Sequence, residues 1–179
     1  MPRQRVYKME EFLNPSKILD QLGLQKDMTA ADFGSGSGGW VLPLARKLAE
    51  GIVYAIDVLE EPLSALKSKA QIQKISNIKT LIADVEKRVP LADESCDLVL
   101  MTNLLFELDD KKGALAEGKR VLKNGGIILL VDWKEDASLG PREGRFPAGE
   151  VKAMAQELGL KIEKEFDAGV YHYGLIMVK

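Results

Sequence analysis

The chain has 179 residues, a length that suits one compact α/β domain. Its formal net charge is −2 and neither half is strongly basic, which argues against a dedicated nucleic-acid-binding protein. The single cysteine, Cys96, excludes an internal disulfide and a thiolate-rich metal site, so no metal site is predicted. No apolar run approaches the roughly 20 residues that span a membrane, and no secretory signal is present, so we expect a cytoplasmic protein without a membrane span.

Strand and helix patterns alternate along the chain. Periodicity and capping signals predict helices over 17–22, 40–49, 63–75, 104–108, 113–122 and 151–158. Apolar runs predict strands over 28–33, 52–56, 78–83, 96–101, 127–131, 161–166 and 173–178. The join at 167–172 is too short for a crossover helix, so the last two strands form an antiparallel hairpin.

This pattern predicts five βα steps followed by the terminal hairpin. The expected fold is a single doubly wound, Rossmann-like α/β domain with a mostly parallel seven-stranded sheet and a C-terminal antiparallel hairpin. The domain is expected to span 1–179, with 1–27 as an N-terminal helix and lid segment.

A glycine-rich turn, Asp-Phe-Gly-Ser-Gly-Ser-Gly-Gly at 32–39, joins the first strand to the following helix. Glycines allow positive φ and a close approach of ligand to backbone, and the amides at a helix start favour a polar or anionic group. Gly34, Gly36 and Gly39 also satisfy the dinucleotide spacing. The turn alone therefore leaves both a nicotinamide cofactor and S-adenosylmethionine open.

Two acidic residues follow the next strands. Asp57 ends the second strand, where a carboxylate accepts hydrogen bonds from both hydroxyls of a ribose. Asp84 follows the third strand, where an acid can bind the exocyclic amine of adenine, and Val85 beside it can lie on the ring. The chain then ends in a hairpin instead of a second mononucleotide half, which favours S-adenosylmethionine.

Taken in order, five motifs resemble the class I S-adenosylmethionine methyltransferases of the small-molecule group, which includes quinone-biosynthesis and arsenite methyltransferases. The motifs are the glycine turn with its leading Asp32, the two acids Asp57 and Asp84, the segment 101–108, and Arg-Val-Leu-Lys-Asn-Gly-Gly at 120–126. The resemblance covers nearly the whole chain, from about residue 14 to 179.

The resemblance implies S-adenosylmethionine as cofactor, S-adenosylhomocysteine as product and a small molecule as substrate. It leaves the oligomeric state open, a homodimer included. It implies cofactor-binding roles for Asp32, Gly34, Ser35, Gly36, Asp57, Val58, Asp84, Val85, Asn103 and Leu104. The turn residues would face the amino-acid and sulfonium part, Val58 would pack on adenine, and Asn103 and Leu104 would present backbone to the methionine moiety.

The chain departs from the family pattern at two positions and lacks two signatures of particular methyltransferase groups. Cys96 stands where relatives usually have an aromatic residue, and we interpret it as a small buried hydrophobe. Phe106 precedes Glu107 where many relatives have histidine, which removes one base. The Asp/Asn-Pro-Pro-Tyr segment and the three-cysteine set are absent, so neither methylation of DNA adenine or protein glutamine nor arsenic chemistry is expected.

The substrate is expected at the carboxyl edge of the sheet, under a lid formed by segments 7–12, 132–146 and 167–173. Methyl transfer is an in-line displacement, so alignment and desolvation supply much of the catalysis, and a base is needed only if the acceptor must lose a proton. The candidate catalytic residues are Asp132, at the end of a buried strand, and His172, the only histidine.

Two alternatives stay open. A nicotinamide-dependent oxidoreductase is motivated by the dinucleotide spacing of the glycines, although no Tyr-x-x-x-Lys pair is evident. A non-catalytic S-adenosylmethionine-binding partner protein is motivated by the weak case for a base.

Overall fold

The computed structural model describes residues 12–179, and segment 7–11 of the expected lid lies outside this range. The strands are β1 Thr29–Phe33, β2 Ile52–Asp57, β3 Ile78–Ile82, β4 Cys96–Thr102, β5 Leu122–Trp133, β6 Lys161–Asp167 and β7 His172–Val178. The helices are α2 Pro15–Leu19, α3 Val41–Lys47, α4 Glu60–Ile72, α5 Lys111–Val121 and α6 Ala148–Glu157, with short 3-10 turns η1 Asp20–Leu22 and η2 Leu105–Glu107.

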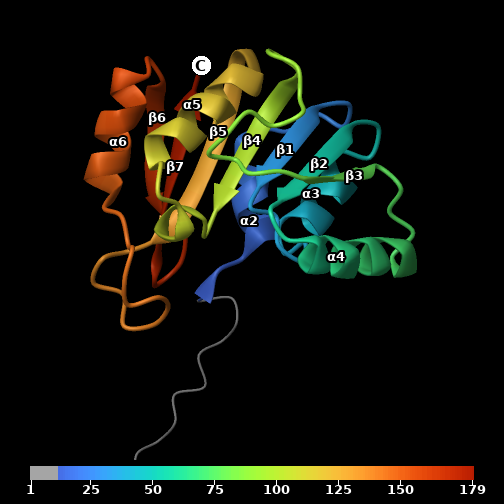
Figure 1. Ribbon diagram of the computed structural model, residues 1–179, viewed down its shortest axis with the longest axis horizontal. Coiled ribbons are helices and arrows are strands. Elements are labelled where there is room, and N and C mark those ends of the chain that lie inside the picture. The colour runs from blue at the N-terminus through green and yellow to red at the C-terminus, as the bar shows by residue number, and fades with distance from the viewer. Residues whose placement is uncertain (1–11) are drawn as a thin grey trace, which may run out of the picture.

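All seven strands form one sheet in the order β3-β2-β1-β4-β5-β7-β6 (Figure 1). Strands β1 to β5 pair in parallel, and β7 runs antiparallel to both β5 and β6. The predicted Rossmann-like fold with its closing hairpin is confirmed. The strand order changes direction between β1 and β4, which is where ligands bind in open α/β sheets.

Two apolar layers fix the helices against the sheet. One layer combines side chains of β1, β4 and β5 with Leu115 of α5 and Val151 of α6. The other packs Leu44 of α3 and Leu66 of α4 against the opposite side of the central strands, together with Leu19 of α2. Because both faces are covered, the central strands are apolar almost throughout, and polar chemistry is confined to their ends.

The structure corrects the expectation of five βα steps. No helix follows β3, and residues 83–95 cross to β4 as an irregular loop. The turn expected at 124–126 lies inside β5, where the pairing with β4 shifts register between Cys96 and Leu98. Helix α4 begins at Glu60, earlier than predicted, because Glu60 and Glu61 place acidic side chains in its first turn, next to the positive end of the helix dipole.

Within the described residues 12–179, no helix is both long and apolar enough to cross a membrane. The same residues contain no cluster of three histidine, cysteine or acidic side chains that would hold a metal ion.

Gly51 allows β2 to start beside β1. A Cβ at this position would lie 1.9 Å from the Met28 carbonyl oxygen, which is backbone and cannot rotate away. We expect Gly51→Ala to lower the free energy of unfolding by about 1–3 kcal/mol, measured by urea denaturation. The control is Gly149→Ala in α6, where nothing lies within 4 Å of the new methyl group. Equal stability of the two variants would contradict this account.

Candidate cofactor site and active site

A cavity of about 410 Å³ lies at the carboxyl ends of the four strands β1 to β4. Its lining residues are Gly34, Gly36, Asp57, Val58, Leu59, Pro62, Ala83, Asp84, Val85, Glu86, Asn103, Leu104, Glu107 and Leu108. Eight of the ten predicted cofactor residues are in this set. The other two, Asp32 and Ser35, are buried beside it, with exposed fractions of 1% and 7%.

At Gly34 the glycine turn lies close to the segment that follows β4. Gly34, Gly36 and Gly38 have φ values of 70°, 51° and 90°. A Cβ at Gly34 would lie 2.6 Å from the Leu104 Cδ1 atom. The turn is also tied to β2, because the Ser35 amide donates to the Ile56 carbonyl at 2.9 Å. The backbone of the turn therefore forms one wall of the cavity.

Asp57 organises the turn. Its Oδ2 accepts the Gly36 amide at 2.9 Å, and its Oδ1 accepts the Leu59 amide at 3.0 Å. Carboxylate oxygens have further lone pairs, so these contacts leave capacity for hydroxyl donors such as those of a ribose.

Asp84 lies across the cavity at the end of β3. Its Oδ1 accepts the Glu86 amide at 3.0 Å, and its Oδ2 lies 3.0 Å from the Lys87 ammonium group. The hydrogen bond from Lys87 lowers the pKa of this carboxyl. Asp84 is therefore ionised at neutral pH and can accept a hydrogen bond from an amino group.

Unpaired polar atoms mark the inner end of the site. Asp32 Oδ1, Ser35 Oγ and Asn103 Oδ1 are buried and have no hydrogen-bond partner. Burial, together with the charge of Asp57, raises the pKa of Asp32 well above its usual value. A buried carboxyl without a partner is costly, and a cation beside it would restore its ionised form. These residues therefore fit the amino-acid end of S-adenosylmethionine, which carries an ammonium and a sulfonium group.

Asp132 supports the cavity from behind. Its Oδ2 accepts the Leu104 and Leu105 amides at 3.2 and 2.8 Å, and its Oδ1 accepts the Trp133 amide at 2.8 Å. Burial raises its pKa to about 6, although the three amides oppose the shift. Asp132 does not line the cavity. The geometry supports a positioning role, in which its carboxylate holds Leu104 against the glycine turn.

His172 lies within an aromatic cluster, which we define as Phe12, Trp133, Tyr171 and His172. Its ring centroid is 4.1 Å from that of Trp133 and 5.5 Å from that of Phe12. The side chain is completely buried. Burial lowers the pKa of His172 to about 4, and the positive charge of Lys134 adds to the shift. His172 is therefore neutral at pH 7, and as a base it is weak.

The charged side chains that line this cavity are all acidic. Four carboxylates line it, those of Asp57, Asp84, Glu86 and Glu107, and no lysine or arginine is among the described lining residues. Sequence reasoning missed Glu86 and Glu107. The only available signal was their position, two residues after Asp84 and within the segment that follows β4.

The fold and the cavity together define a Rossmann-like domain that binds an adenosine-bearing cofactor. Residues 31–130 match the family model described as a methyltransferase domain, which is more than half of the 179 residues. The chain belongs to this family, as the resemblance predicted, and the cofactor of its class I members is S-adenosylmethionine.

Individual relatives agree with this assignment. The chain is 29% identical over 127 residues to a demethylmenaquinone methyltransferase of Geobacillus stearothermophilus, covering 70% of this chain and 54% of that protein. The chain thus spans about half the length of the curated relatives it matches. A solved S-adenosylmethionine-dependent methyltransferase from Aquifex aeolicus superimposes with a TM-score of 0.86 at 30% identity, covering 93% of this chain and 90% of that one.

The fold alone does not determine the reaction. The cyclase SpnF superimposes with a TM-score of 0.77 at 21% identity, covering 86% of this chain and 58% of that one. At that identity the likeness concerns the fold, and function has to be argued from the site.

Asp132→Asn tests the support of the cavity wall. A carboxamide can accept from only one edge, so either the Leu104 and Leu105 amides or the Trp133 amide would face an NH2 group. We expect the free energy of unfolding to fall by about 1–3 kcal/mol, and the affinity for S-adenosylhomocysteine to fall about tenfold, measured by denaturation and calorimetry. Asp136→Asn, in an exposed loop, is the control.

Comparison of the wild-type protein with Asp132→Asn also gives a pH dependence of stability. Because burial raises the pKa of folded Asp132 to about 6, the folded protein holds this proton more tightly than the unfolded chain does. The resulting stabilisation is complete below about pH 4 and is lost as the pH rises through 6. Between about pH 4 and pH 6, the free energy of unfolding of the wild-type protein should fall by about 2–3 kcal/mol relative to that of Asp132→Asn. A constant difference would refute the raised pKa.

Proposed function

We propose that this protein transfers a methyl group from S-adenosylmethionine to a small-molecule acceptor. The observation that carries the proposal is the acidic cavity at the end of the strands, together with the unpaired oxygen of Asp32, which is buried two residues before the lining residue Gly34. Such a site attracts a cationic ligand, and S-adenosylmethionine carries positive charge at its sulfonium and ammonium groups.

The same charge disfavours the nicotinamide alternative. A dinucleotide would bring two phosphate charges into a cavity lined by Asp57, Asp84, Glu86 and Glu107, with no cation among the described lining residues to offset them. Like charges placed together across an interface cost several kcal/mol. The glycine spacing permits either cofactor, whereas the lining charges favour S-adenosylmethionine.

Each wall of the cavity has a separate task in this proposal. Asp57 would hold the ribose hydroxyls, and Asp84 with Val85 would hold the adenine edge. The glycine turn and the Asn103 backbone would fix the amino-acid part. When bound, S-adenosylmethionine supplies an activated methyl group, and the chain aligns the acceptor and excludes water.

The aromatic cluster is the proposed acceptor side. It begins at the same end of β5 as Asp132, which holds the Leu104 wall of the cavity and immediately precedes Trp133. Trp133 Nε1 and both ring nitrogens of His172 make no hydrogen bond of normal geometry. Phe12 is the exposed member of the cluster. An apolar, ring-bearing acceptor with a polar substituent suits these surroundings, and demethylmenaquinone, after which the Geobacillus relative is named, is one candidate.

Neither predicted catalytic residue is well prepared as a strong base. Asp132 is occupied by three amides, and His172 has a pKa of about 4. We therefore propose catalysis by alignment and desolvation, on an acceptor atom that is already nucleophilic or that loses its proton readily. The cytoplasmic location and the oligomeric state stay predictions.

Ligand titration tests the cofactor. We expect S-adenosylmethionine and S-adenosylhomocysteine to bind in calorimetry and NADH not to bind. The double variant Glu86→Gln/Glu107→Gln keeps the shape of the cavity but removes two charges. Its affinity for S-adenosylmethionine should therefore fall about 3- to 10-fold more than its affinity for S-adenosylhomocysteine, whose thioether is uncharged.

Glu163→Gln on β6, far from the cavity along the sheet, is the matched control. Tight NADH binding without S-adenosylhomocysteine binding would overturn the proposal. Binding of S-adenosylmethionine without methyl transfer to any of a panel of phenols, hydroquinones and aromatic amines, demethylmenaquinone included, would favour the non-catalytic partner protein.

Trp133→Phe tests the acceptor side. The variant keeps a ring in the cluster but removes the unpaired Nε1 group. We expect kcat/KM for the acceptor to fall about tenfold, while the affinity for S-adenosylhomocysteine stays within twofold. Tyr54→Phe on β2, outside the cluster, should change neither value. A loss of cofactor affinity with unchanged kcat/KM for the acceptor would place the acceptor elsewhere.

A further inference from the structure

The loop 83–95 presents an unusual problem for this fold. It leaves β3 at one edge of the sheet and passes β2 and β1 before it enters β4, and it does so without a helix. Its first residues, Ala83 to Glu86, form the wall of the cavity at the end of β3. Irregular segments of this length need external contacts to hold one conformation.

An ion pair on α5 supplies those contacts. Arg120 Nε donates to Glu117 Oε2 at 2.8 Å, and Arg120 Nη2 donates to Glu117 Oε1. Both side chains are largely buried, with exposed fractions of 16% and 10%. A bidentate arginine–carboxylate pair in such surroundings is rigid, because the planar guanidinium loses little freedom per hydrogen bond.

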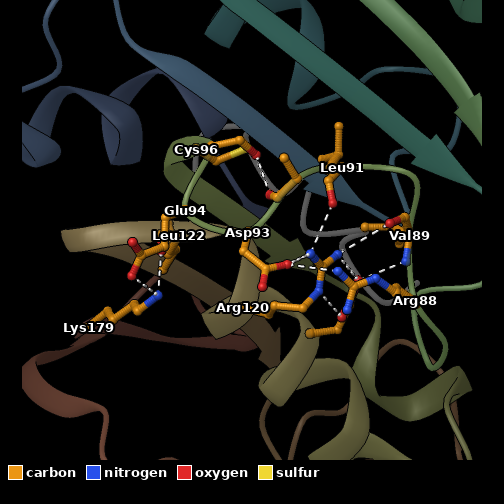
Figure 2. Close-up of polar contacts among 12 residues, drawn as sticks. Arg88, Val89, Leu91, Asp93, Glu94, Cys96, Arg120, Leu122 and Lys179 are labelled. Atoms are coloured by element: carbon orange, nitrogen blue, oxygen red, sulfur yellow. Dashed lines mark hydrogen bonds and ion pairs between the residues drawn. The ribbon is translucent and has the colours of Figure 1, made fainter.

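The pair binds the main chain of the loop in both directions (Figure 2). Arg120 Nη1 donates to the Leu91 carbonyl at 2.9 Å, and Arg120 Nη2 donates to the Val89 carbonyl at 3.2 Å. The Val89 amide in turn donates to Glu117 Oε1 at 2.7 Å. Arg120 also pairs with Asp93, whose carboxylate binds Arg88 at 2.9 Å.

The other end of α5 holds the start of the loop. The amide of Asp110, the N-cap residue of α5, donates to the Glu86 carboxylate. The loop therefore lies along one helix and is fixed at both ends of it. Neither Arg120 nor Glu117 lines the cavity, so any influence on a ligand has to pass through the loop.

We propose that Arg120 and Glu117 are positioning residues that set the adenine side of the cofactor cavity by holding Asp84 and Val85 through the main chain at Val89 and Leu91. This inference rests on the proposed function, since it assumes that adenine lies against Asp84. The Asp84 carboxylate then accepts the adenine amino group, and its placement determines how well an amino group is distinguished from a carbonyl group.

The experiment measures that discrimination by calorimetry. S-adenosylhomocysteine carries the adenine amino group, and S-inosylhomocysteine carries a carbonyl oxygen there. The wild-type protein should prefer the amino compound. Arg120→Lys keeps the charge but cannot form the bidentate pair with Glu117. We therefore expect the affinity for S-adenosylhomocysteine to fall about tenfold and the preference for the amino compound to fall to about twofold or less. Glu117→Gln should act in the same direction.

The control is Lys112→Met, which removes a surface ion pair between α5 and Glu157 without touching the loop. It should leave both affinities unchanged. Hydrogen exchange supplies a second measurement. The Val89 amide should lose protection in Arg120→Lys and Glu117→Gln, whereas the amides of β4 should keep theirs.

The outcomes separate this inference from the proposed function. If the wild-type protein binds neither compound, the proposed function fails. If the wild-type protein distinguishes the two and both variants keep the same affinities and preference, the positioning role is overturned. A uniform rise in exchange across β4 and the loop, with both ligands weakened equally, would show a purely structural role and also overturn it.

Discussion

Carboxylates gathered at one edge of the sheet impose a constraint, because each needs a compensating partner once it leaves water. Asp57 and Asp132 accept backbone amides from the turns beside them. Asp84 pairs with Lys87. Asp32 is as deeply buried as Asp132, at 1% exposed, but one of its oxygens has no partner. The fold thus satisfies three acids internally and leaves one oxygen of the fourth without a partner, which is why we propose a cationic ligand for this site.

Charged side chains also hold the loops of the cavity in place. The cavity is built mainly from loops, and loops at the ends of parallel strands have no ladder of their own to hold them. Asp57 fixes the glycine turn, Asp132 fixes the segment after β4, and the Glu117–Arg120 pair fixes the loop after β3. In each case a side chain on a helix or strand binds main-chain groups of a loop. Rigid support of this kind determines how accurately a site is preorganised.

The sequence predicted the parts of the site that depend on strand order alone. Asp57 and Asp84 follow consecutive buried strands, and parallel strands bring their carboxyl ends together whatever the loops do. The hydrogen bonds from Arg120 to the loop could not be predicted from the sequence. Its partners lie about 30 positions earlier in the chain, and only the path of the loop brings them to Arg120. The expected five βα steps were wrong for a different reason: the predicted elements themselves included no helix between the strands at 78–83 and 96–101, and the structure has an irregular loop there.

The environment of the predicted bases constrains the acceptor. Burial makes His172 a weak base, and the three amides on Asp132 would each lose a good acceptor if that carboxylate took a proton during turnover. Neither residue is therefore suited to take a proton from a strongly basic acceptor oxygen or carbon. An acceptor whose proton leaves easily, such as a phenol or hydroquinone, needs little help beyond desolvation and alignment. We propose the aromatic cluster as the acceptor side because its rings can pack against the same molecules, and on that proposal packing and proton chemistry favour one class of substrate.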